Sequence, residues 1–202
     1  MPLTEFQRAL LAELAKAPTD ERYLAGGAAM HFAPNSARYS DDFEFFHDTE
    51  ARVATAFAVD RDRLQRAKYA VDVELSLPGF IRAVVRQGEQ ATRVDWAHDS
   101  AWRFMPLVRD TLGGLLLHPV DLAINKVLAL AGRDEPRDFV DILFVHRHVL
   151  PLAAACWAAV GKDPGLSRCI HIVSATPTAH PEVGEVTWGK LGFNPPPRER
   201  KP

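Results

Sequence analysis

The amino-acid sequence predicts an α+β protein, in which a sheet-bearing part precedes a helical part. The sheet is indicated by three alternating stretches with turn residues between them, at residues 70–77, 80–86 and 91–97. The helical part is indicated by apolar residues at helical spacing after three prolines, Pro119, Pro136 and Pro151. We therefore expect the chain to change character near residue 118.

The first 70 residues add two strands and three helices to this expectation. Helical spacing of leucines after Thr4 predicts a helix that this threonine caps and that ends near Pro18. The remaining expected elements are a strand at 23–25, a helix at 28–32, a strand at 40–46 and a helix at 50–68. The two strands would begin the sheet.

Composition bounds the class of protein. With 47% apolar and 25% charged residues, the chain of 202 residues is typical of a globular, water-soluble protein. We expect a core at residues 1–118, a helical part at 119–166 and an irregular tail at 167–202. The formal charge of −2 provides no global field for nucleic acid, although a local basic face would be compatible with it.

The expected compartment is the cytoplasm, without membrane attachment. The longest apolar run, residues 149–160, is far shorter than the ~20 residues that span a bilayer. The first residues lack the basic and apolar blocks of a secretory signal. Cys156 and Cys169 have no metal-like spacing and are expected to be free thiols.

The sequence around Asp42 and Glu44 predicts a site for divalent cations and a nucleotide. Residues i and i+2 of a strand point to the same face, so these two carboxylates can hold divalent cations while Phe43 and Phe45 face a core. The preceding Gly26-Gly27 pair, which has no Cβ atoms, lets the backbone approach a triphosphate closely. Each feature alone has a plain alternative, a turn for the glycines and a solvated edge strand for the carboxylates.

Asp95 is unusual because aspartate is disfavoured inside a strand and an unpaired charge there is costly to bury. A metal ion would compensate it, and an ion pair with an arginine is the alternative. Lys126 lies in an otherwise apolar helix face, from which its ammonium group could extend to water.

Five blocks, in order and spacing, resemble the AbiEii/AbiGii-type toxin nucleotidyltransferases of the DNA polymerase β-like superfamily. They begin at Tyr23, Arg38, Arg93, Pro119 and Pro136, and together they lie within residues 5–165. The resemblance implies a mixed β-sheet flanked by helices with a helical C-terminal part. It also implies a nucleoside triphosphate as substrate, Mg²⁺ as cofactor, RNA such as tRNA or a protein as acceptor, and an antitoxin as possible partner.

By this resemblance, residues of the blocks receive roles. The metal ligands, for a two-metal site, would be Asp42, Glu44 and Asp95, with Asp95 as possible general base. The triphosphate would lie against Gly26, Gly27, Ser40 and Lys126, and Asp138 and Asp141 would orient Lys126 or Arg133. Two departures from the pattern are Ala28, where a small hydroxyl residue is usual, and Glu44, where Asp is commoner.

The expected function is thus Mg²⁺-dependent transfer of a nucleoside monophosphate to a macromolecule, of the AbiEii toxin type. Two alternatives stay open: a weak or silent interaction module with the same fold, and a nucleotidyltransferase that modifies a small molecule.

Overall fold

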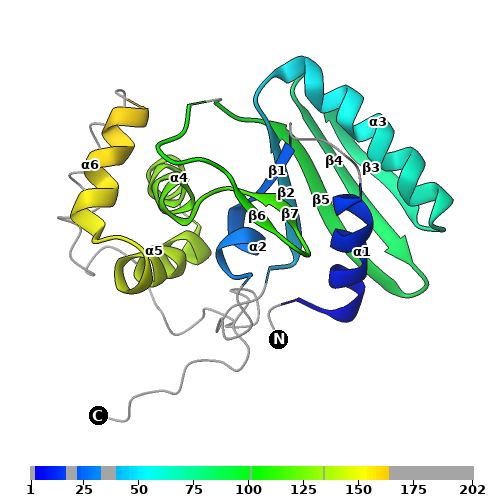
Figure 1. The fold of residues 1–202 in the computed structure, drawn as a ribbon, viewed down its shortest axis with the longest axis horizontal. Helices are drawn as coiled ribbons and strands as arrows, with labels where there is room; N and C mark the ends of the chain where they lie inside the picture. Colours follow the sequence, from blue (N-terminus) through cyan, green and yellow to red (C-terminus); the bar gives the residue numbers. More distant parts are fainter. Residues whose placement is uncertain (1–2, 17–21, 33–39, 101, 134, 164–202) are drawn as a thin grey trace, which may run out of the picture. The chain divides into compact units, whose positions relative to one another are not determined.

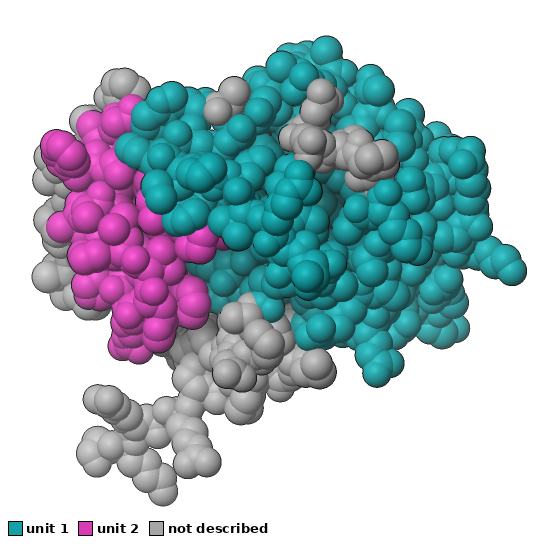
Figure 2. Space-filling model, viewed as in Figure 1, with its two compact units in different colours: residues 1–118 teal, residues 119–202 magenta. Residues whose placement is uncertain are grey.

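The computed structural model describes residues 3–16, 22–32, 40–100, 102–133 and 135–163. The chain divides into two compact units, residues 1–118 and residues 119–202 (Figure 2). The expected irregular tail at 167–202 and the thiol of Cys169 lie outside the described residues, as does Arg38 of the second block.

In the described part of the first unit, seven strands form one sheet in the order β3-β4-β5-β2-β1-β7-β6 (Figure 1). The pairs β2–β5 and β1–β7 are parallel and the other pairs are antiparallel, so the sheet is mixed. The strands are β1 (Arg22–Ala25), β2 (Asp42–His47), β3 (Ala70–Leu77), β4 (Phe80–Gln87), β5 (Gln90–His98), β6 (Val108–Asp110) and β7 (Gly114–Leu116).

One face of this sheet is the core of the first unit. Alternation along β2 buries Phe43 and Phe45, and alternation along β5 buries Trp96. Helix α3 (Glu50–Arg66) covers this face, where the rings of Phe57 and Trp96 meet edge to face with centroids 5.0 Å apart. The residues between these apolar positions therefore point to the opposite face.

A buried polar network holds α3 to the strands. Asp60 of α3, only 1% exposed, accepts hydrogen bonds from the guanidinium group of Arg22 and, at 2.8 Å, from Nε1 of Trp96. Arg22 also donates to the main-chain oxygen of Leu14 in helix α1 (Glu5–Ala15). The charge of Asp60 is thus paired and hydrogen-bonded, which is the condition under which a buried carboxylate is tolerated.

Helix α1 begins as the sequence predicts. The Thr4 hydroxyl accepts from the Gln7 main-chain N–H at 3.1 Å, while Oε1 of Gln7 accepts from the Thr4 N–H at 3.0 Å, which forms a capping box. Nε2 of Gln7 donates to the main-chain oxygen of Ser40 at 2.8 Å. The first helix therefore also holds the residue that leads into β2.

The described part of the second unit consists of α4 (Pro119–Gly132), α5 (Pro136–His148) and α6 (Leu152–Lys162). Its core is formed by Ile124, Val127, Ile142, Ala155, Cys156 and Ala159, and the side chain of Cys156 is buried. Among the described residues no single helix is long and apolar enough to cross a membrane; α5 and α6, bent by 115° at their break, meet the length and composition criteria only as a pair.

The predicted fold class, α+β with a mixed sheet and helices, is confirmed. Two details differ from the sequence prediction. Helix α2 (Gly26–Met30) begins at the glycine pair itself and not after it. Strands β6 and β7, which have three residues each, are not predicted because so short a segment does not display a period of two.

Candidate active site

Three carboxylates lie on the face of the sheet opposite the aromatic core. Asp42 and Glu44 alternate with the buried phenylalanines of β2 and so share one side. In the parallel pair of β2 and β5, Glu44 is the register partner of Asp95 and Asp42 is the partner of Arg93. Because neighbouring strands lie ~4.8 Å apart, the sheet brings these carboxylates together from residues 51 positions apart in the chain.

Gly26 makes room for the carboxylate of Glu44. Ala25, at the end of β1, is the antiparallel partner of Glu44, and Gly26 follows it with a φ of +64°. A Cβ atom at Gly26 would lie 1.6 Å from Oε2 of Glu44, so no other residue fits without moving that side chain. Gly27 and Ala28 follow within α2, both buried. The position of the Glu44 carboxylate thus depends on a glycine at residue 26.

Asp42 is nearly buried and strongly hydrogen-bonded. The hydroxyl of Ser40 donates to its Oδ1 at 2.9 Å, and Nη2 of Arg93 donates to its Oδ2 at 2.7 Å. Ser40 is itself 4% exposed and held by Gln7. The orientation of Asp42 is therefore set by Ser40, which Gln7 of α1 holds in place, and by Arg93 of β5.

Asp95 forms the ion pair that the sequence leaves open as the alternative to a metal. Arg82 of β4, its antiparallel register partner, donates from Nε to Oδ1 at 2.8 Å and from Nη2 to Oδ2 at 2.7 Å. This bidentate arrangement is the strong form of an arginine–carboxylate pair. The hydrogen bond to Asp95 raises the pKa of Arg82, so the guanidinium group stays charged.

The donor chemistry of this face suits Mg²⁺, which prefers carboxylate oxygens. Asp42 and Glu44 fit such an ion by their chemistry, because both present carboxylate oxygens on the same face of β2. Asp95 is different, since Arg82 binds both of its oxygens. Accordingly, within the described residues no group of three or more acidic, histidine or cysteine side chains is placed to hold a metal ion together.

The other expected site residues meet in the second unit. Nζ of Lys126 lies 3.2 Å from Oδ1 of Asp138 and 2.8 Å from Oδ2 of Asp141. Nε of Arg133 donates to Oδ2 of Asp138 at 2.7 Å. Both carboxylates are fully buried, so the ammonium group of Lys126 is held between them and does not extend freely to water.

An aromatic and ionic cluster lies further along the carboxylate face. Tyr23 is the β1 partner of Phe46, two residues beyond Glu44, and the guanidinium group of Arg103 lies 4.9 Å from the centroid of its ring. Arg103 donates to Oδ1 of Asp48 at 2.5 Å and to Oδ2 at 3.0 Å. Burial raises the pKa of Tyr23, and the hydrogen bond from Arg103 lowers the pKa of Asp48.

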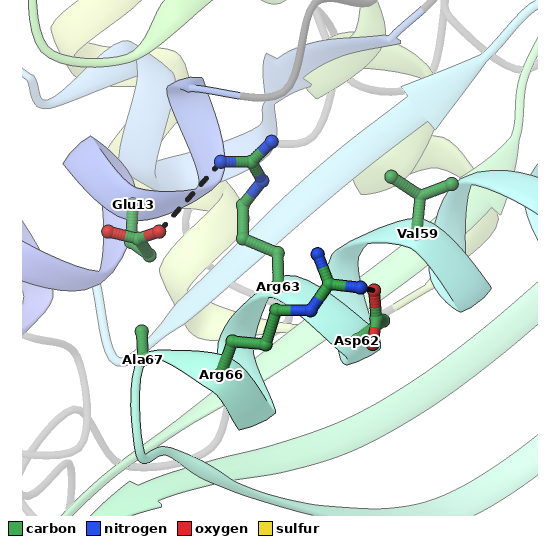
Figure 3. A pocket seen from close by; sticks show the side chains of 6 residues that line it. All are labelled: Glu13, Val59, Asp62, Arg63, Arg66 and Ala67. Carbon is green, nitrogen blue, oxygen red and sulfur yellow. Dashed lines mark ion pairs between the residues drawn. The ribbon is translucent and has the colours of Figure 1, made fainter.

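A pocket of about 320 Å³ lies elsewhere, between α1 and α3 (Figure 3). Its arginines are paired within the pocket wall, Arg63 with Glu13 at 3.9 Å and Arg66 with Asp62 at 2.6 Å. Helix α3 packs on the aromatic face of the sheet, so this pocket is on the side away from the carboxylates. Its charges are compensated internally, and we assign it no role.

Three residues of the candidate site are not predicted from the sequence: Gln7, Arg82 and Arg93. Arg93 precedes Asp95 by two residues in a predicted strand, and this spacing is a usable signal that both share a face. The contacts of Gln7 and Arg82 depend on how separate elements pack, and no local pattern indicates them.

The chain matches a known protein family over most of its length. The family described as nucleotidyl transferase AbiEii toxin, Type IV TA system, matches residues 8–194. A search of curated protein sequences found no significant match.

Solved structures show the same fold at low identity. The crystal structure of JHP933 from Helicobacter pylori is 20% identical with a TM-score of 0.57, covering 82% of this chain and 75% of that one. MenT4, a nucleotidyltransferase toxin from Mycobacterium tuberculosis, is 16% identical with a TM-score of 0.57, covering 78% and 62%. The Megavirus polyadenylate synthase is 17% identical with a TM-score of 0.51, covering 75% and 33%. Because the family match spans most of the sequence, the resemblance seen in the five blocks is confirmed, and the chain belongs to the AbiEii nucleotidyltransferase toxin family, whose members transfer nucleotides.

Proposed function

We propose that the protein transfers a nucleoside monophosphate from a nucleoside triphosphate to a macromolecular acceptor, RNA such as tRNA or a protein, in an Mg²⁺-dependent reaction. The observation that carries this proposal is the set of carboxylates on one sheet face beside a glycine whose missing side chain makes room for Glu44. The family membership supports the nucleotide-transfer chemistry.

In the first unit, the carboxylates are proposed to bind Mg²⁺. Asp42 and Glu44 would hold Mg²⁺, and Asp95 would complete the set of ligands or accept the proton of the acceptor hydroxyl. Bound Mg²⁺ supplies neutralisation of charge on the triphosphate and on the departing pyrophosphate. Ser40 orients Asp42 through its 2.9 Å hydrogen bond, which leaves the carboxylate little rotational freedom.

The glycine pair and Lys126 would bind the triphosphate. Without Cβ atoms, Gly26 and Gly27 let phosphate oxygens approach main-chain N–H groups closely. Lys126 would supply a cation to a phosphate oxygen, oriented by Asp138 and Asp141, which contact its Nζ in the free protein. In the transfer step an acceptor oxygen forms a bond to the α-phosphorus, the bond to the β-phosphate oxygen breaks, and pyrophosphate leaves.

The biological setting proposed here follows from the family. A toxin–antitoxin family implies an antitoxin as functional partner, and we place the reaction in the cytoplasm, where nucleoside triphosphates and tRNA are available. A reading frame for a small DNA-binding protein beside this one would support that setting.

The test uses purified protein, each of the four labelled nucleoside triphosphates, Mg²⁺ and total RNA or cell lysate. Label is expected to appear on a macromolecule, to be lost with EDTA and to be lost in Asp42→Asn. Asp72→Asn is the matched control, because Asp72 lies on an exposed strand and pairs with Arg86 at 3.0 Å, away from the carboxylate set. No transfer and no binding of Mg–nucleotide by calorimetry would refute the proposal.

One observation favours a second candidate, the weak or silent module. Two of the three carboxylates are engaged by arginines, an arrangement that also serves a purely structural sheet. A protein that binds a partner but whose interaction is unchanged by Asp42→Asn would support this candidate. Label on a small acceptor in place of RNA or protein would instead identify a small-molecule nucleotidyltransferase.

A further inference from the structure

Two arginines form hydrogen-bonded ion pairs with two of the proposed metal-binding carboxylates. Arg82 contacts both oxygens of Asp95, at 2.8 and 2.7 Å, and Arg93 contacts one oxygen of Asp42, at 2.7 Å. The side chains of Asp95 and Asp42 are 6% and 11% exposed, whereas those of Arg82 and Arg93 are 33% and 38% exposed. The guanidinium groups therefore stand between nearly buried carboxylates and solvent.

The charge of the cluster follows from the register of the strands. Arg82, Asp95 and Glu44 are successive partners across β4, β5 and β2, and Arg93 and Asp42 are partners in a neighbouring row. Among these five groups, the two guanidinium charges offset two of the three carboxylate charges. A divalent cation is attracted far less by this cluster than by three unpaired carboxylates, because Coulomb energy scales with the net charge it meets.

The two arginines are held to different degrees. Arg82 makes a two-bond contact, whereas Arg93 uses one nitrogen on Asp42. Nε of Arg93 is a buried donor for which the described residues provide no hydrogen-bond acceptor. A buried donor without an acceptor destabilises the arrangement that contains it. The contact of Arg93 with Asp42 therefore leaves the Nε–H group of Arg93 without a hydrogen bond to the described residues.

We propose that Arg82 and Arg93 form a guanidinium latch that occupies the metal-binding carboxylates in the free protein and transfers to substrate phosphate oxygens when a divalent cation and a nucleoside triphosphate bind together. This inference rests on the proposed function. The exchange is balanced in charge: the cation replaces the guanidinium groups on Asp42 and Asp95, and the triphosphate supplies the oxygens that the guanidinium groups then bind. A planar guanidinium group presents the same pair of donors to a phosphate as to a carboxylate.

The latch predicts opposite effects of one substitution on two ligands. In Arg82→Gln, which keeps a polar side chain and removes the charge, Mn²⁺ without nucleotide should bind about tenfold more tightly, because the cation no longer competes with a guanidinium group. A non-hydrolysable triphosphate analogue in the presence of Mg²⁺ should bind about tenfold more weakly, because a phosphate contact is lost. Arg93→Gln should show the same pair of changes.

The measurements are titrations of Mn²⁺ by electron paramagnetic resonance and of the analogue by calorimetry, neither of which requires turnover. Arg86→Gln is the matched control: Arg86 lies on β4 four residues from Arg82 and pairs with Asp72 at 3.0 Å, so neither affinity should change. Thermal melting reports whether each variant is folded. Arg82→Lys, which keeps the charge and gives up the two-bond contact, should bind Mn²⁺ with an affinity between those of the wild type and Arg82→Gln.

The outcomes separate the latch from the proposed function. If the wild type binds Mn²⁺ and the analogue, and both affinities are unchanged or both are weakened in Arg82→Gln and Arg93→Gln, the latch is wrong and the proposed function stands. If Arg82→Gln does not fold, Arg93→Gln and Arg82→Lys decide the question by the same criteria. If the wild type binds neither ligand, the latch and the proposed function fail together.

Discussion

At the scale of single residues, Gly26 carries the most specific demand of the structure. Its φ is +64°, and a Cβ atom added to it would lie only 1.6 Å from Oε2 of Glu44, so Gly26→Ala must displace the carboxylate. We expect Gly26→Ala to lose binding of Mg–nucleotide in calorimetry, in addition to about 1 kcal/mol of stability for the left-handed backbone.

Gly88 provides the control for that experiment. It has a φ of +61° with nothing within 4 Å of its Cβ position, so Gly88→Ala carries the same backbone strain without the clash. Urea unfolding should show a similar loss of about 1 kcal/mol in both variants, while Gly88→Ala binds nucleotide normally. Normal nucleotide binding by Gly26→Ala would show that binding does not require the Glu44 carboxylate in its position beside Gly26.

The ion pair of Asp48 and Arg103 makes a residue-scale prediction about pH. Arg103 lowers the folded-state pKa of Asp48, so this pair stabilises the protein above the unfolded pKa of about 3.9, and the contribution is lost as pH falls through the lower folded pKa. Asp48→Asn should therefore reduce the free energy of unfolding by about 1 kcal/mol at pH 7, and this difference should shrink below pH ~4.

The exposed pair of Asp62 and Arg66 is the control for the pH experiment. Their side chains are 59% and 79% exposed, so Asp62→Asn should change the free energy of unfolding by less than about 0.5 kcal/mol. Urea unfolding between pH 3 and pH 8 measures both differences. A difference for Asp48→Asn that grew as the pH fell would contradict the stabilising effect of this ion pair.

Single residues also show how far sequence reasoning reaches. The placement of Asp42 and Glu44 on one face follows from the period of two in a strand, and the structure agrees with it. The sequence leaves the partner of Asp95 open between a metal and an arginine, because Arg82 lies in another strand and is brought to it by register alone. Local periodicity specifies a face, and pairing between strands specifies the contact.

At the scale of elements, the contact between α4 and α5 is an ionic one inside an apolar core. Lys126 of α4 forms an ion pair with the fully buried Asp141 and, together with Arg133, contacts Asp138. We expect Lys126→Met to reduce the free energy of unfolding by about 3 kcal/mol, because it leaves carboxylates buried with less compensation. Lys126→Met with Asp141→Asn should recover more than half of that loss.

Urea unfolding measures this effect, with Lys16→Met as control, since Lys16 is 62% exposed and pairs with Glu13 at the surface. Once urea unfolding shows that the double variant is folded, its affinity for nucleotide tests whether Lys126 and Asp141 together contribute to binding. A single Lys126→Met variant as stable as the wild type would show that the ion pairs of Lys126 with Asp138 and Asp141 do not contribute to the free energy of unfolding.

The length of a helix or strand decides whether it can be predicted from the sequence. The longer helices and strands are predicted within a few residues because their hydrophobic period extends over several turns or pleats. Strands β6 and β7 are held by pairing with each other and, for β7, with β1, and so depend on tertiary context. Helix α2 starts at the glycine pair because Gly26 adopts the positive φ that the turn requires.

At the scale of the whole molecule, the near-neutral charge disfavours non-specific binding of RNA. With 24 basic and 26 acidic residues, the chain lacks the field that gives strong non-specific binding. We expect random RNA to bind with a dissociation constant weaker than about 10 μM at physiological salt, in filter-binding assays. Tight binding of random RNA with a steep salt dependence would contradict this expectation.

We propose above all that Asp42 and Glu44 bind the divalent cation that accompanies the nucleoside triphosphate. The most direct measurement is anomalous scattering from crystals of the full chain grown with Mn²⁺ and a non-hydrolysable triphosphate analogue. We expect a manganese peak at about 2.0–2.4 Å from oxygens of both Asp42 and Glu44. Manganese bound to the triphosphate with neither carboxylate among its ligands would contradict it.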